Sequence, residues 1–157
     1  MRLLVLILLV GCSGAAQTQT PDAPMPRDAA APDPDALKVA GQYATDVSLE
    51  RSSCAAITVE SRPTTVAHTA GTATVLITHA GLSYAGTVMR DGAFVTDPQL
   101  AGSSVEVHRL VLTGRFTTTG FDARVHADVT RNGAALCDYD VKWVGTQQGA
   151  PNVIPGL

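Results

Sequence analysis

Residues 121–129 read Phe-Asp-Ala-Arg-Val-His-Ala-Asp-Val, with an apolar residue at every odd position and a polar residue at every even position. Strict alternation of this kind is the pattern of a β-strand with one buried face and one solvated face. Residues 136–144 show the same pattern, because the odd positions from Cys137 to Trp143 are all apolar or aromatic. Residues 131–133, Arg-Asn-Gly, separate the two segments, so we expect an antiparallel hairpin.

The register of this hairpin follows from matching its faces. A three-residue turn with Gly133 in the left-handed conformation pairs Thr130 with Ala134, and it keeps apolar residues opposite one another. A two-residue turn would shift the pairing by one and mix the faces. The predicted register also sets three attractive outward pairs: Asp122 with Lys142, Arg124 with Asp140, and His126 with Asp138.

Shorter alternating stretches fill the remaining domain. They lie at residues 43–49, 57–59, 75–77, 82–88, around 95 and at 105–112. Together with the hairpin they make about eight short strands, and no crossover helix separates them, so antiparallel pairing is expected. The sequence therefore predicts an all-β domain, either an antiparallel up-and-down barrel or a sandwich. His79 lies beside an Ala80-Gly81 turn, and we expect it to be solvated.

The strand order and the Gly41-Gln42-Tyr43 opening resemble lipocalin-like and avidin-like barrels. This likeness is architectural, has no diagnostic motif and implies no ligand.

Residues 1–11 carry one positive charge, Arg2, followed by an apolar run. This is typical of a secretory signal, and the run is too short for a stable membrane-spanning helix. It ends in Leu9-Val10-Gly11-Cys12, which resembles the lipobox of bacterial lipoproteins. The resemblance implies a diacylglycerol on the Cys12 thiol, cleavage before Cys12 and, usually, acylation of the new amine. The alternative is an ordinary signal peptide with an incidental cysteine.

The lipobox implies a lipid-anchored protein of the cell envelope, with the membrane as its first partner. Ser13 after the cysteine is compatible with the outer membrane of a Gram-negative bacterium. Residues 12–37, rich in Pro and Ala, show no apolar periodicity and are expected to be a disordered linker. The β domain is predicted at 38–144, and residues 145–157 are either a loose tail or a strap over the domain.

Two cysteines remain for the folded domain, Cys54 and Cys137. In an oxidising envelope compartment we expect them to form a structural disulfide. Two buried thiols or a redox pair are the alternatives, and the absence of a Cys-x-x-Cys motif gives the redox pair little support.

Charge and motifs narrow the function classes. The chain has 11 basic and 14 acidic residues, and aromatics make up only 4%, so nucleic acid is a poor candidate partner. The four histidines show no zinc spacing, and there is no Gly-x-Ser-x-Gly elbow and no glycine-rich phosphate loop. We therefore predict no catalytic residue, metal ligand or cofactor.

One group of polar residues stands out on the outward face of the hairpin. It consists of His126, Asp128, Asp138 and Asp140. These four residues, hereafter the polar cluster, are either a weak divalent-cation site or proton-sensitive patch, or a solvated face with ordinary ion pairs. Arg124 and Lys142 on the same face favour ion pairs.

The function predicted from these observations is a lipid-anchored envelope β-domain that binds a small ligand or an envelope protein. The alternative is a structural or assembly accessory of the outer membrane without a small-molecule ligand, and an enzyme ranks third. An apolar cavity open at one end of a barrel would favour ligand binding. A filled core with an exposed apolar patch would favour a protein partner.

Overall fold

The computed structural model describes residues 36–156, which form nine strands and no helix. The strands are β1 (Gly41–Ser52), β2 (Thr64–His68), β3 (Thr74–His79), β4 (Leu82–Val88), β5 (Ala93–Thr96), β6 (Gln99–Gly102), β7 (Glu106–Thr117), β8 (Gly120–Arg131) and β9 (Ala134–Gln147). The predicted signal peptide, Cys12 and nearly all of the predicted linker lie outside the described residues.

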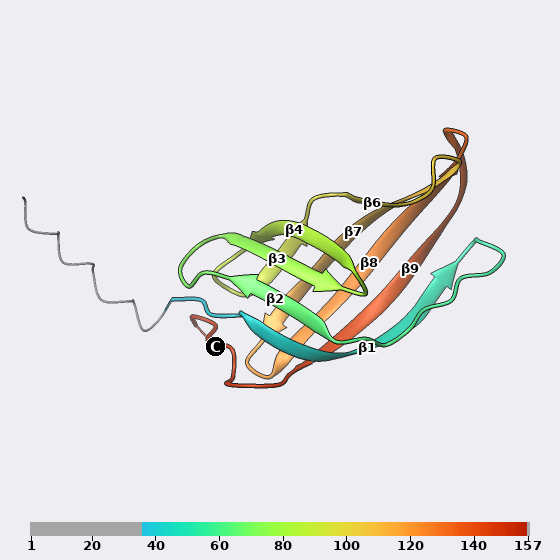
Figure 1. Ribbon diagram of the computed structural model, residues 1–157. Coiled ribbons are helices and arrows are strands. Elements are labelled where there is room, and N and C mark those ends of the chain that lie inside the picture. The colour runs from blue at the N-terminus through green and yellow to red at the C-terminus, as the bar shows by residue number, and fades with distance from the viewer. Residues whose placement is uncertain (1–35, 157) are drawn as a thin grey trace, which may run out of the picture. The chain divides into compact units, whose positions relative to one another are not determined.

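The sheet closes on itself as an antiparallel eight-stranded barrel with one extra strand. Neighbours along the chain pair from β1 to β5 and from β7 to β9, while β9 returns to β1 and β5 pairs with β7 (Figure 1). The extra strand, β6, pairs with residues 107–110 of β7, next to the stretch that β5 occupies. The all-β prediction is thus confirmed, in its barrel form.

Two strands were not apparent from the sequence, and one predicted strand is absent. β2 and β6 have few apolar residues, and alternation alone does not mark them. Residues 57–59, predicted as a strand, lie instead in the unpaired connection between β1 and β2. Ile57 and Val59 do alternate toward the interior, but no neighbouring strand pairs with them.

The predicted register of the β8–β9 hairpin is wrong, although the two strands are adjacent. The turn has two residues, Asn132 and Gly133, both with positive φ, and Arg131 pairs with Ala134. The pairing then slips by one between Val129 and Thr130, because a β-bulge leaves Leu136 unmatched. The bulge restores the separation of apolar and polar faces, and it places Arg124 opposite Lys142 and His126 opposite Asp140.

The barrel interior is largely aromatic. All but one of the chain's aromatic side chains are buried in one core: Tyr43, Tyr84, Phe94, Phe116, Phe121 and Trp143. Phe94 packs on Phe116 with ring centroids 4.8 Å apart, and Tyr43 packs on Phe121 at 5.1 Å. The composition is therefore poor in aromatics, yet it concentrates them in the barrel.

The segments that precede β1 and follow β9 close one end of the barrel, hereafter the base. Lys38 and Val153 form a short antiparallel bridge, and Ile154 is buried. The Tyr43 hydroxyl lies 2.7 Å from the Val39 carbonyl oxygen and 2.8 Å from Oδ1 of Asn152. The segment that follows β9 is therefore a strap across the base, and β9 itself runs beyond the predicted domain limit at Val144.

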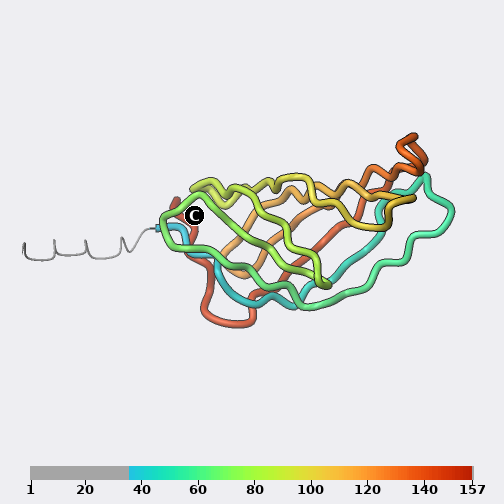
Figure 2. Tube along the Cα trace, turned by 45° about the horizontal axis from the view of Figure 1, so that its top comes forward, coloured from blue at the N-terminus to red at the C-terminus, as the bar shows by residue number. Residues whose placement is uncertain are grey.

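At the opposite end of the barrel, the strands extend to different lengths. β1, β7, β8 and β9 have 12 to 14 residues, whereas β2 to β5 have four to seven. The long strands project past the short ones, so that one wall of the barrel continues where the other has ended (Figures 1 and 2). This open end is the mouth of the barrel.

Candidate functional site at the barrel mouth

A cavity of about 550 Å³ lies in the mouth. One wall comes from the projecting strands and includes Leu110, Val125 and Val141, while Leu82 lies at the edge of the short strands. Apolar side chains therefore line most of the surface. A cavity of this size is within the range of small-molecule sites, roughly 300–1,000 Å³.

Three aromatic rings form the floor of this mouth cavity. His79 stacks on Trp143 with ring centroids 4.2 Å apart, and Tyr84 meets Trp143 edge-on at 5.8 Å. All three side chains are at least 94% buried. Trp143 is the chain's single tryptophan, so it reports on this cavity alone.

His79 is buried, and the prediction that it is solvated is wrong. Its ring nitrogen Nδ1 lies 2.9 Å from the Thr64 hydroxyl, which accepts a hydrogen bond from the Thr45 hydroxyl at 2.7 Å. Desolvation lowers the pKa of His79, and the nearby Arg62 charge acts in the same direction, while the Glu60 backbone opposes both. The ring is therefore held neutral at pH 7.

A connection between β1 and β2 covers one side of the cavity. This connection, residues 53–63, is hereafter the side strap, and Ile57 and Val59 point from it toward the core. Its start is fixed by the Cys54–Cys137 disulfide, which confirms that predicted pair. Its end is fixed by the Ser61 hydroxyl, which accepts a hydrogen bond from the Val47 amide at 2.9 Å.

The remaining polar side chains at the rim already have partners. The guanidinium of Arg62 donates to Glu60 from Nε at 3.1 Å and also from Nη2. The Tyr139 hydroxyl lies 3.0 Å from Nδ1 of His108, and burial raises the pKa of Tyr139. At the rim, the charges of Glu60 and Arg62 therefore neutralise each other, and the Tyr139 hydroxyl already has a hydrogen-bond partner.

The polar cluster does come together, on the outer surface of the barrel. His126 Nδ1 lies 2.7 Å from Asp140, and Nε2 lies 3.4 Å from Asp128. Arg51 of β1 joins the cluster, with Nη1 2.6 Å from Asp138 and Nε 2.9 Å from Asp140. Sequence reasoning missed Arg51, because it considered only β8 and β9.

Ion pairing accounts for the contacts of this cluster. The bond to Asp140 raises the pKa of His126, and the same bond, followed by Arg51, lowers the pKa of Asp140. Ser53 and Arg51 lower the pKa of Asp138. Within residues 36–156 no group of three or more His, Cys, Asp or Glu side chains is placed to hold a metal ion. The cluster thus behaves as a charge network rather than as a cation site.

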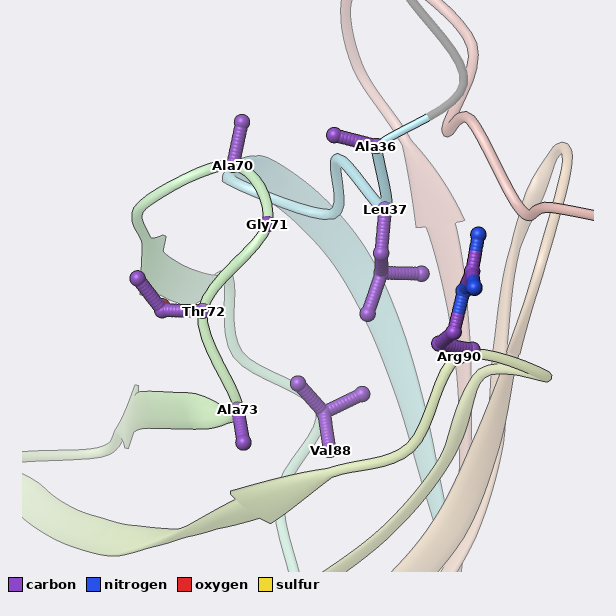
Figure 3. A pocket seen from close by; sticks show the side chains of 8 residues that line it. All are labelled: Ala36, Leu37, Ala70, Gly71, Thr72, Ala73, Val88 and Arg90. Atoms are coloured by element: carbon purple, nitrogen blue, oxygen red, sulfur yellow. The ribbon is translucent and has the colours of Figure 1, made fainter. Parts of the chain in front are cut away.

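A second cavity, of about 500 Å³, lies near the base (Figure 3). Among the described residues its walls are small or aliphatic side chains, including Leu37 and Val88, and Arg90 is the one charged residue of that set. It has no cluster of polar groups and no aromatic surface. We therefore regard the mouth cavity as the better candidate site.

The sequence contained signals for the mouth residues that were not used. His79 continues the inward alternation of Val75 and Ile77, so its side chain had to face the interior. Tyr84 lies on the inward face of the predicted strand at 82–88. What alternation could not show is which inward residues line an open end.

No protein-family model, curated protein or solved structure matches the chain. Within the described part of the chain no helix is long and apolar enough to cross a membrane. The functional argument therefore depends on the geometry of the site.

Proposed function

We propose that the barrel is a binding module that holds a small apolar molecule in the mouth cavity. We further propose that the chain is held in the cell envelope by a lipid on Cys12, the prediction made from its lipobox.

The observation that carries the proposal is the contrast between the two cavities. The cavity near the base, of about 500 Å³, is lined by small or aliphatic side chains and has no aromatic ring among its described lining residues. The mouth cavity has aromatic rings and aliphatic side chains in its lining, and its space of about 550 Å³ is open to the outside. Apolar surface left uncovered costs free energy, and a bound molecule would recover it.

A saturable change in Trp143 fluorescence is the direct test. We would titrate the full chain carrying Cys12→Ala, so that no acyl group competes, with an uncharged apolar dye, N-phenyl-naphthylamine. We expect energy transfer from Trp143 to one bound dye molecule. Leu82→Arg places a charge at the edge of the cavity and should weaken binding by at least about tenfold.

Ser83→Arg is the matched control, because Ser83 is adjacent and exposed on the outer face of the same strand. It should bind the dye like the unmodified barrel. Equal weakening in both variants, or no saturable binding at all, would exclude the mouth as a ligand site. The structural-accessory interpretation would then be the better one.

The anchor is tested separately. Replacing Cys12 with Ala should abolish incorporation of labelled fatty acid and remove the protein from the membrane fraction. Unchanged labelling in that variant would refute the anchor without affecting the binding proposal.

A further inference from the structure

The floor of the mouth cavity carries hydrogen-bond donors rather than acceptors. The Thr45 hydroxyl lies 2.7 Å from the Thr64 hydroxyl and 3.4 Å from the Tyr43 carbonyl oxygen, so the shorter bond goes to Thr64 and leaves the Thr64 proton for Nδ1 of His79. Nδ1 is then the acceptor of a neutral imidazole, and the ring proton already has an acceptor in the Glu60 backbone. The lowered pKa of His79 keeps the ring in this single-proton form at pH 7.

Two further polar groups on the floor have no hydrogen-bond acceptor among the described residues. They are the indole N–H of Trp143 and the hydroxyl of Tyr84. Neither is a sealed, unsatisfied group, since within residues 36–156 the single buried atom of that kind belongs to His68. Both side chains line the mouth cavity, which is the space beside them that a ligand could enter.

Burial without a partner has a measurable consequence for Tyr84. Desolvation raises the pKa of its hydroxyl to about 12, so the group remains a protonated donor. Indole N–H is a donor only. The Tyr139 hydroxyl and the Arg62 guanidinium, which lie at the rim, are already bonded to His108 and Glu60.

We propose that the mouth selects uncharged apolar molecules that carry a carbonyl oxygen, a ketone or an ester, which accepts hydrogen bonds from Tyr84 and Trp143. This inference rests on the proposed function and specifies its ligand class. A hydrocarbon leaves these donors unsatisfied when it displaces water from them, and that loss is what makes such a site discriminate. The Glu60–Arg62 pair is already neutralised, so the rim adds no demand for an ionic head group.

The test compares two probes, a medium-chain methyl ketone and the alkane with the same number of heavy atoms. Both are titrated against the Cys12→Ala chain, with Trp143 emission as the readout. The measured quantity is the ratio of the two affinities in each variant, which removes differences in the solubility of the probes.

Tyr84→Phe deletes one donor and keeps an aromatic ring on the floor. It should lower the ketone-to-alkane affinity ratio by about three- to tenfold, the effect of one hydrogen bond. Tyr43→Phe is the matched control, because its hydroxyl lies at the base and bonds Val39 and Asn152, and it should leave the ratio unchanged.

An unchanged ratio in Tyr84→Phe, with both probes still binding, would overturn the proposed ligand class and leave the binding function intact. An equal fall in Tyr43→Phe would also overturn it. If neither probe changes Trp143 emission in the Cys12→Ala chain, the binding function itself fails, and this inference fails with it.

Discussion

Ala80 occupies a backbone conformation that alanine disfavours. It has a φ of 49° and Gly81 has a φ of 83° in the two-residue turn that joins His79 to Leu82. Such turns favour Asn-Gly, and left-handed alanine costs about 1 kcal/mol. We therefore expect Ala80→Asn to raise the melting temperature by a few degrees in a circular-dichroism melt.

The β8–β9 turn allows the opposite substitution, from asparagine to alanine, to be tested. Asn132 has a φ of 52° before Gly133 in the β8–β9 turn, so Asn132→Ala should destabilise by a similar amount. If both substitutions left the melting temperature unchanged, turn strain would not contribute to the stability of this barrel.

His126 should make stability depend on pH near neutrality. Its pKa is raised above 6.5, first by the bond to Asp140, so the folded state holds its proton more tightly than the unfolded state. The stabilisation is complete below the unfolded pKa and is lost as pH rises through the folded pKa. Urea unfolding at a series of pH values should show stability falling above about pH 6.5, and His126→Gln should remove that decline.

His79 acts in the opposite sense, which makes it the internal control for His126. Its pKa is lowered by burial, so its contribution is present above the unfolded pKa and lost as pH falls through the folded one. The two histidines can therefore be separated by the sign of the slope. A decline on the alkaline side that persisted in His126→Gln would contradict the assignment.

The β8–β9 hairpin shows why register was harder to predict than strand position. Alternation placed every inward residue of 121–129 correctly, because alternation depends on local side-chain direction alone. The register was predicted from a three-residue turn and from the agreement of the apolar and polar faces of two strands, but each strand has a second neighbour. Arg124 forms a salt bridge with Glu50 on β1 at 2.7 Å, and Asp128 forms one with Arg109 on β7 at 3.6 Å.

The sizes of the inward-facing residues on β8 and β9 fit the observed register. Phe121 lies opposite Gly145, and a Cβ at Gly145 would collide with the Phe121 ring. We expect Gly145→Ala to destabilise the barrel by about 1–3 kcal/mol in urea unfolding. Gly149→Ala is the control, since a Cβ there meets nothing within 4 Å. Equal stability of the two variants would argue against this packing.

At the scale of the molecule, alternation predicted an all-β antiparallel fold but not which end stays open. Closure depends on long-range pairs such as β1 with β9 and β5 with β7, which no local pattern encodes. The open mouth arises because β2 to β5 are shorter than the strands they face. The disulfide was predictable because the predicted β domain has two cysteines, whereas His79 and Tyr84 became candidate site residues through the difference in strand lengths.

Two buried tyrosines differ in their role: Tyr43 lies at the closed base of the barrel and Tyr84 at its open mouth. Burial raises the pKa of both Tyr43 and Tyr84 to about 12, but only the hydroxyl of Tyr43 has described protein acceptors, Val39 and Asn152. Tyr43→Phe removes the donor that these two acceptors share and leaves Oδ1 of Asn152 only the Gln147 amide at 3.3 Å, which should lower the free energy of unfolding by about 1–3 kcal/mol. Hydrogen exchange should accelerate in residues 37–40 and 152–154, while Trp143 emission and dye binding stay unchanged.

Tyr84→Phe should show the reverse pattern, because Tyr84 lines the mouth cavity and its hydroxyl has no acceptor among the described residues. Its unfolding free energy should change little, whereas its preference for carbonyl-bearing probes should fall. A loss of dye binding in Tyr43→Phe that matched its loss of stability would contradict this division. The two ends of the barrel would then be one energetic unit, and a ligand in the mouth would in turn have to stabilise the strap across the base.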